Sequence, residues 1–173
     1  MNGISGRDIA VIMENNKSNI FNNVTKESFK YDIAEDRELS EKEYWNNSIK
    51  NMCINEFTLR TGKKTRRENK ITTDKEYNFI IGNIDRKIVG ENSILIFENS
   101  NMIPQSNNDL SIDSIFYLMC QHNLRVYNAE KCYFLLFINY QKMIIKEIIK
   151  NEEIISMLIK IEKHFWKTYK RMK

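Results

Sequence analysis

The segment from Ser40 to Gly62 constrains the fold most, because it carries both the start and the stop signal of one long helix. Ser40 and Glu43 form a capping box, with Ser at the N-cap and Glu at the third helical position. Gly62 suits the left-handed conformation in which many helices end. The apolar residues between these signals recur at helical spacing and predict a buried stripe, made of Trp45, Ile49, Met52, Cys53 and Phe57.

Two groups of β-prone runs follow this helix and are separated by a second helical pattern. We expect short strands within 77–81, 84–89 and 94–97, and two longer strands at 131–139 and 142–149. Helices are expected at 4–13, 111–127 and 150–172, whereas 14–39 is polar and predicted to be irregular or short-helical. This order predicts an α/β sandwich around a small sheet, and without a linker or repeat we expect a single domain over 1–173.

Charge and composition exclude several classes of function. Lys and Arg exceed Asp and Glu by only 27 to 23, and no apolar run approaches the length of a membrane span. The odd, scattered set of three cysteines indicates a reduced, cytoplasmic protein, and two histidines argue against a zinc site or a Ser-His-Asp triad. The 26 Ile, 22 Asn and 19 Lys residues have AT-rich codons, which points to a bacterial or phage genome.

Five segments carry a more specific signal in their order along the chain: ISGRDIAVI, EYWNNSIKNMCINEFTLRTGKKTRREN, NIDRKIVGENSILIFENSN, YLMCQHNLRVYNAEKCYFLLFI and IEKHFW. Together they resemble the phage lambda-exonuclease-like (YqaJ-type) recombination nucleases. The resemblance runs over about residues 3–167, with a shortened stretch near 104–109. It implies a restriction-endonuclease-like (PD-(D/E)xK) α/β core, in which helices flank a small central mixed sheet.

The resemblance also implies where the catalytic residues of such a nuclease would lie. In this family an Asp on one strand and a Glu on the next hold Mg²⁺, and a Lys two residues after the Glu acts on the attacking water. A further Glu lies on the first long helix, and a later helix carries a Gln-x-x-x-Tyr motif. The strand Asp matches Asp85, the strand Glu matches Ile96 and the strand Lys matches Glu98. The Glu of the long helix matches Lys50, and the Gln and Tyr of the later motif match Met119 and Asn123.

Only Asp85 keeps the residue type of the family, so the resemblance implies a pseudo-nuclease with no catalytic residues, no bound metal and no cofactor. Two further interpretations stay open at this point. Asp85 and Glu98 could form a migrated ligand pair for Mg²⁺, assisted by Lys50 or Lys87. Alternatively, Lys50 could bridge both carboxylates in a structural ion pair, or Asp85 could be a simple turn residue.

A basic cluster follows the long helix and is the candidate for binding DNA or a protein partner. It consists of Arg60, Lys63, Lys64, Arg66, Arg67 and Lys70. Contacts between such a cluster and phosphates would make binding depend on salt. A run of charge is also typical of a solvated face.

These observations favour a catalytically inactive protein of a phage or mobile element that acts by binding in the cytoplasm of the bacterial host cell. The expected role is anti-defence, as an anti-CRISPR type inhibitor of a host Cas effector, of its DNA, or of both. The alternatives are a Mg²⁺-dependent DNA exonuclease with a rearranged site and a non-catalytic DNA-binding subunit of a phage recombination complex. Double-stranded DNA and a second copy of the chain are further expected partners, and a membrane is not.

Overall fold

The computed structural model describes residues 3–9, 12–13, 40–100 and 115–171. Its elements in chain order are the 3-10 turn η1 (Gly6–Asp8), α2 (Glu41–Thr61), β1 (Thr65–Arg67), β2 (Thr72–Thr73), β3 (Ile81–Gly82), β4 (Arg86–Ile88), β5 (Ser93–Ser100), α3 (Ile115–Val126), β6 (Lys131–Ile138), β7 (Lys142–Ile149) and α4 (Glu152–Arg171). The segment 14–39 and the expected start of the second helix at 111–114 lie outside the described residues.

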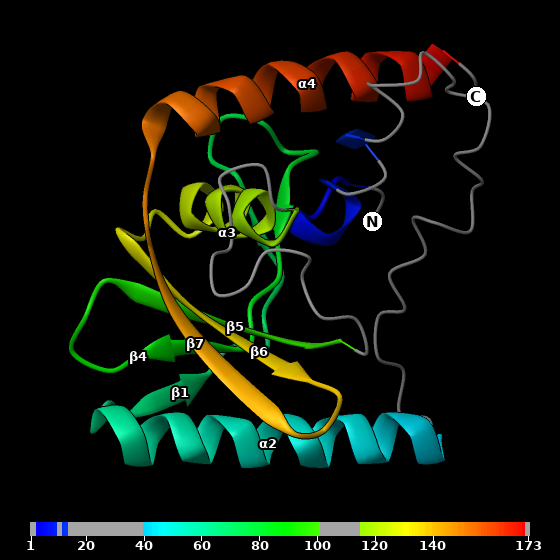
Figure 1. Ribbon diagram of the computed structural model, residues 1–173. Coiled ribbons are helices and arrows are strands. Elements are labelled where there is room, and N and C mark those ends of the chain that lie inside the picture. The colour runs from blue at the N-terminus through cyan, green and yellow to red at the C-terminus, as the bar shows by residue number, and fades with distance from the viewer. Residues whose placement is uncertain (1–2, 10–11, 14–39, 101–114, 172–173) are drawn as a thin grey trace.

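The main sheet has five strands in the order β1-β4-β5-β6-β7 (Figure 1). Strands β5 and β6 pair in parallel over eight residues each, and the other neighbours are antiparallel, so the sheet is mixed as the resemblance predicts. Parallel neighbours need a crossover, and α3 lies in the connection between β5 and β6. A separate two-stranded sheet joins β2 to β3.

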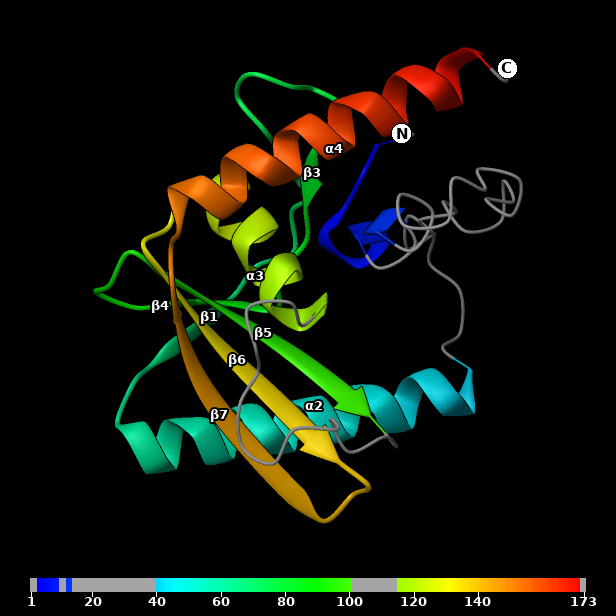
Figure 2. The same ribbon diagram turned by 45° about the horizontal axis from the view of Figure 1, so that its top comes forward.

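Helices cover both faces of the main sheet because successive side chains on β5 and β6 point to opposite faces. Leu95 and Phe97 pack with Phe57 of α2, whereas Ile94 and Ile96 pack with α3 on the other face. Helix α4 lies outside α3 and contacts it and the N-terminal segment, so the molecule is layered α2, sheet, α3, α4 (Figure 2). A sheet that is buried on both sides gives its central strands the continuous apolar sequence seen here.

The ends of α2 confirm the predicted signals. The Oγ of Ser40 accepts a hydrogen bond from the backbone N–H of Glu43, and Gly62 follows the helix with a φ of 69°. The predicted buried stripe is wrong in part, because Trp45 and Met52 are exposed. The helix is rotated so that Ile54 joins Cys53 and Phe57 against the sheet, which turns the line through positions 45 and 52 outward.

The strand predictions hold best at 131–149, where β6 and β7 form a hairpin closed by Asn139 and Tyr140 with positive φ. Of the expected run at 77–81, only Ile81 is in a strand. No run of alternating apolar residues predicted β1 or β2, because both strands are short and polar. None of the helices in the described part of the chain has the length and apolarity required to cross a membrane.

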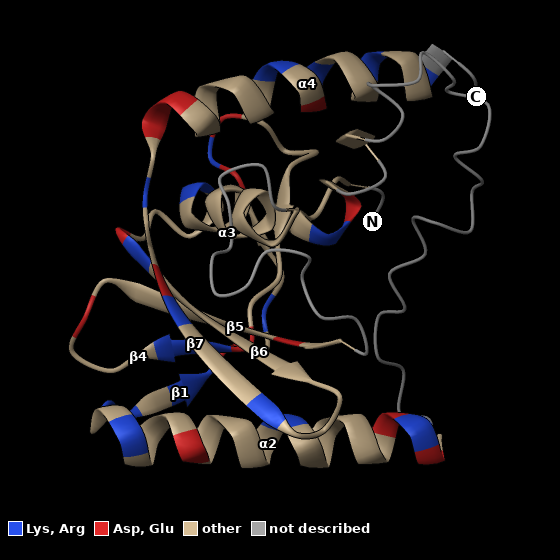
Figure 3. Cartoon of the chain, in the orientation of Figure 1, with Lys and Arg blue, Asp and Glu red and all other residues tan. Residues whose placement is uncertain are grey.

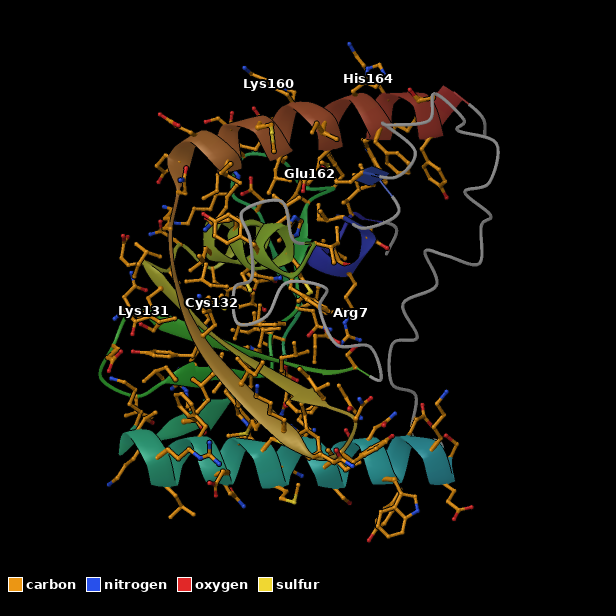
Figure 4. All side chains as sticks on the ribbon, viewed as in Figure 1. Arg7, Lys131, Cys132, Lys160, Glu162 and His164 are labelled. Atoms are coloured by element: carbon orange, nitrogen blue, oxygen red, sulfur yellow. The ribbon has the colours of Figure 1, made fainter. Side chains whose placement is uncertain are left out.

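A buried ion pair joins α4 to α3. The Nδ1 of His122 lies 2.6 Å from Oε1 of Glu162, and its Nε2 lies 2.9 Å from the carbonyl oxygen of Ile81. Figure 4 shows Glu162 pointing inward from α4, whereas Lys160 and His164 point outward. Burial lowers the pKa of His122, but the Glu162 carboxylate, the carbonyl of Ile81 and nearby Asp8 together more than offset this and hold that pKa above its usual value. His122 is therefore a packed histidine that links α3 to α4.

We predict that Ser40→Ala lowers the free energy of unfolding by about 1 kcal/mol, because the first turn of α2 loses its side-chain acceptor. Ser48→Ala, inside the same helix, is the matched control and should change the stability little, since Ala is the better helix former. Chemical denaturation of both variants measures this, and equal stabilities would contradict the capping role of Ser40.

Candidate functional site

The six positions that the sequence analysis singled out converge on one cavity of about 120 Å³. They come from α2, the approach to β4, β5 and α3, which are far apart in the chain. Gly6 and Arg7 of η1 and the loop residues 83–84 complete the lining. The predicted set that meets there is Lys50, Asp85, Ile96, Glu98, Met119 and Asn123.

Asp85 lies where β4 and β5 separate. Its backbone N–H donates to the carbonyl of Leu95 at 3.2 Å, and its Oδ2 accepts from the backbone N–H of Phe97 at 2.8 Å. The Nζ of Lys50 lies 2.7 Å from the other carboxylate oxygen, Oδ1. Asp85 is thus fixed by backbone and side-chain partners, which is more than a simple turn residue requires.

Glu98 brings a second carboxylate to the cavity from β5. Burial raises its pKa, while the guanidinium of Arg7, with Nη2 3.0 Å from Oε1 of Glu98, opposes this and nearby Asp85 adds to it. Arg7 is labelled in Figure 4, where it extends from η1 toward the sheet. The interpretation in which Lys50 bridges both carboxylates is therefore correct only for Asp85. Glu98 forms its ion pair with Arg7 instead.

Asn123 positions the chain around the cavity. Its Oδ1 accepts from the backbone N–H of Asn83 at 3.1 Å, and its Nδ2 donates to the carbonyl of Met119 at 3.0 Å. A Cβ at Gly6 would lie 2.5 Å from that same Nδ2, so only glycine lets η1 approach α3 this closely. Asn123 therefore holds the loop before Asp85 and lies directly against the segment that carries Arg7.

Arg7 and Asn83 line the cavity and were not singled out as site residues from the sequence. The available signal was their place in the matched segments: Asn83 lies two residues before Asp85, whereas Arg7 lies in ISGRDIAVI, which holds no assigned position. Neither has a spacing that points to the cavity, because η1 reaches it only through the packing of the N-terminal segment on α3.

The basic cluster lies along β1 and its flanks, outside the cavity. Arg60 pairs with Glu56 at 2.7 Å and Lys63 with Glu91. Lys64, Arg66, Arg67 and Lys70 are exposed. The ladder between β1 and β4 then continues to the site, because the backbone N–H of Glu68 donates to the carbonyl of Asp85 at 3.3 Å.

Nucleases of the family that the sequence resembles hold Mg²⁺ at this site, and the chemistry of the donors here fits such an ion in part. Mg²⁺ prefers carboxylate oxygens, and Asp85 and Glu98 supply two carboxylates on neighbouring strands of one cavity. Within the described ranges, no group of three or more His, Cys, Asp or Glu side chains is placed to bind a metal ion. A cation here would thus be held by the two carboxylates and completed by ligands other than these side chains.

Comparison with known proteins identifies the family. The model of the YqaJ-like viral recombinase domain matches residues 1–130, and the chain belongs to that family. The chain is 34% identical over 168 residues to the uncharacterized protein YqaJ of Bacillus subtilis (strain 168). The matched region covers 95% of this chain and 52% of that protein. The chain therefore spans about half the length of this curated relative.

Two solved exonucleases share the fold. An alkaline exonuclease from Laribacter hongkongensis superposes with a TM-score of 0.69 at 8% identity, over 98% of this chain and 89% of that one. A phage-related exonuclease from Haemophilus somnus 129PT superposes with a TM-score of 0.56 at 11% identity, over 100% and 92%. The mixed sheet with flanking helices is thus the exonuclease fold of the restriction-endonuclease-like type.

The expectation of a pseudo-nuclease that is not an enzyme is wrong. The chain belongs to the family of a viral recombinase domain and shares its fold with exonucleases, and neither finding supports a loss of catalysis. The physical reason lies in the period of a β-strand. Positions 96 and 98 point to the same face, so the cavity keeps a second carboxylate although position 96 is Ile.

We predict that Glu98→Gln gains stability relative to the natural protein as the pH rises from about 4 toward neutrality. The raised pKa means that the folded state binds the Glu98 proton more tightly than the unfolded state. The natural protein therefore loses stability as the pH rises from the ordinary pKa of a glutamate, which applies in the unfolded state, through the higher pKa of Glu98 in the folded state. Gln does not titrate, so the variant does not lose this stability. Thermal unfolding at several pH values measures the difference.

The matched control for this comparison is Glu147→Gln, which removes an exposed carboxylate of β7 that pairs with Lys131. A trend with pH as large as that of Glu98→Gln would show that burial of Glu98 is not its cause.

Proposed function

We propose that the protein is a Mg²⁺-dependent DNA nuclease of the YqaJ family, in which Asp85 and Glu98 hold the metal. The observation that carries this proposal is the convergence of both carboxylates on the one cavity that all six family-matched positions line. Membership of a recombinase family whose fold is shared with exonucleases supports a nuclease reaction over other metal-dependent chemistry.

The residues of the cavity have distinct tasks in this proposal. Mg²⁺, when bound, would stabilise charge on the scissile phosphate and promote ionisation of a water molecule. Asp85 is held in place by the N–H of Phe97, and Lys50 supplies a fixed positive charge beside it. Arg7 has an exposed side chain beside Glu98 and can contact a phosphate that enters the cavity. Asn123 keeps the two approaching segments in register.

The β1–β4 ribbon supports double-stranded DNA as the substrate class. Arg66 pairs with Lys87 and Arg67 with Arg86 in its register, so like charges stand directly opposite each other on both faces. Such pairs are unfavourable in an isolated sheet. Glu68 offsets part of this charge through its ion pair with Lys87, at 2.7 Å, and a polyanion would stabilise the rest. Figure 3 shows these basic segments side by side on the two strands. Arg86 follows Asp85 directly, so phosphates bound here would continue into the cavity.

The anti-defence role and the non-catalytic DNA-binding subunit both presumed that the chemistry was lost. With that premise corrected, inhibition of a Cas effector stays a prediction from the sequence alone. The described residues supply no feature specific to such a partner. We therefore develop the nuclease reading, in which the same basic ribbon binds substrate.

We predict that the protein degrades linear DNA with Mg²⁺ or Mn²⁺, and that Asp85→Asn and Glu98→Gln each lower the rate at least about a hundredfold, because each removes one of two metal-holding carboxylates. Gel assays on linear and supercoiled DNA, with folding checked by circular dichroism, measure this. Glu147→Gln is the matched control and should retain the full rate. A folded natural protein without cleavage activity, or cleavage that survives Asp85→Asn, would refute the proposal.

We predict that neutralising Arg66 and Arg67 together weakens binding to double-stranded DNA and lowers the slope of log affinity against log salt by about 2, since each contact with a phosphate contributes about 0.9. Binding is measured by fluorescence anisotropy in EDTA, so that cleavage does not interfere. The control replaces two exposed basic residues outside the ribbon, Lys75 and Lys142, with Gln. An unchanged slope in the Arg66 and Arg67 variant would exclude the ribbon as the DNA-binding surface.

A further inference from the structure

The side chain of His122 lies where three parts of the chain meet in the interior. Its Nδ1 faces Glu162 of α4, and its Nε2 faces the carbonyl oxygen of Ile81 in β3. The carboxylate of Asp8, from η1, also acts on the ring. All three side chains, of His122, Glu162 and Asp8, are buried, so protein atoms have to satisfy the hydrogen bonds of the ring.

Both ring nitrogens face atoms that accept hydrogen bonds. An ionised carboxylate and a backbone carbonyl have no proton to donate, and a neutral imidazole donates from one nitrogen only. With a neutral ring, one of the two contacts, at 2.6 Å and 2.9 Å, would bring two acceptors together. The imidazolium ion donates at both contacts, and the charges of Glu162 and Asp8 stabilise it. The geometry therefore calls for a second proton, and the charge of Asp8 beside the ring favours its place on His122.

The contact with Ile81 ties β3 and the N-terminal segment to α3. The backbone N–H of Ile81 donates to the carbonyl of Ile4 at 2.8 Å, and the N–H of Ile4 donates to the carbonyl of Phe79 at 2.6 Å. Asp8 accepts hydrogen bonds from the backbone N–H and the Oγ of Ser5, each at 2.7 Å. The ring thus holds the N-terminal segment in two ways, through its hydrogen bond to Ile81 and through its charge beside Asp8.

The N-terminal segment, residues 3–9, forms one wall of the candidate cavity through Gly6 and Arg7. We propose that His122 carries both ring protons at neutral pH, and that the loss of one of them at alkaline pH weakens the docking of this segment. The wall that Gly6 and Arg7 form then opens, so a buried titration controls whether the cavity is complete.

The loss of the proton acts on the N-terminal segment rather than on α4. The remaining ring proton stays on Nδ1, because Glu162 is buried and a carboxylate accepts a stronger hydrogen bond than a carbonyl does. The lone pair of Nε2 then faces the carbonyl oxygen of Ile81, and Asp8 loses the positive charge beside it. Helix α4 keeps its contact with His122, whereas both links to the N-terminal segment are weakened.

The sign of the pH effect follows from the raised pKa of His122. The folded state binds the ring proton more tightly than the unfolded state. The stabilisation is therefore complete below the ordinary pKa of histidine, about 6.5, and is lost as the pH rises through the higher pKa of the folded state. This inference concerns the contact between residues 3–9 and α3, so it does not rest on the nuclease reaction, and a failure of cleavage would leave it untouched.

The first test is nitrogen NMR of the imidazole ring over a series of pH values. The chain has two histidines, so His164→Gln leaves His122 as the single histidine signal. We expect two protonated ring nitrogens at neutral pH and one, Nδ1, at alkaline pH. A neutral ring at neutral pH, with the second proton on Glu162, would overturn the proposal.

The second test is hydrogen exchange of the backbone N–H groups of Ile4 and Asp8, each rate divided by that of an unfolded peptide at the same pH. These groups donate to the carbonyls of Phe79 and Ser5. We expect their protection to fall at least about tenfold over the pH range in which His122 loses its proton, because a buried carbonyl loses its donor. Protection within β6 should stay constant. Protection of residues 3–9 that does not change over this range would overturn the proposal.

Three variants assign the effect to the ring. Glu162→Gln should move the titration and the change in exchange together to lower pH, by at least about one unit, because the carboxylate no longer favours the imidazolium ion. His122→Gln does not titrate, so exchange at residues 3–9 should no longer depend on pH beyond the intrinsic rate. His164→Gln is the matched control and should keep the natural pH dependence, since His164 is exposed and points outward from α4 (Figure 4). Should His122→Gln fail to fold, the shift in Glu162→Gln decides, and exchange that does not follow the ring titration in that variant would overturn the proposal.

Discussion

The parallel pairing of β5 with β6 is the constraint on which the rest of the structure depends. Both strands are eight residues long, β6 is apolar after Lys131 and β5 is apolar from Ile94 to Phe97, so both faces must be covered. The chain must also cross over the sheet to run in the same direction again, which brings α3 onto one face. Helix α2 then covers the other face, and α4 closes over α3 through the buried pair of His122 and Glu162.

The candidate site arises at the point where this sheet opens. Strand β4 is short and its pairing with β5 begins only at Arg86, which leaves the N–H of Phe97 for another partner. Asp85 accepts that hydrogen bond and so places its carboxylate beside Glu98 in the cavity. The same departure connects the basic ribbon of β1 and β4 to the cavity, so a polyanion could run from one to the other.

The resemblance in the sequence pointed to six positions that line the cavity but gave the wrong conclusion about catalysis. Comparing residue types position by position counted Ile96 as a lost ligand and Glu98 as a misplaced one. The strand makes these positions neighbours on one face, so the site retains two acidic side chains. Arg7 escaped notice because η1 reaches the cavity through the close approach of Gly6 to Asn123, which no local pattern records.

The sequence by itself determined the limits of α2 and the two strands of the β6–β7 hairpin, because caps, turns and apolar runs are local signals, and the family resemblance supplied six of the positions that line the cavity. Only the tertiary structure decided which side of α2 is buried, since the rotation of a helix depends on the surface it packs against. It also decided the pairing of Lys50 with Asp85 and of Arg7 with Glu98. Ion-pair partners that lie far apart in the chain are chosen by the packing of whole elements, which short-range patterns do not contain.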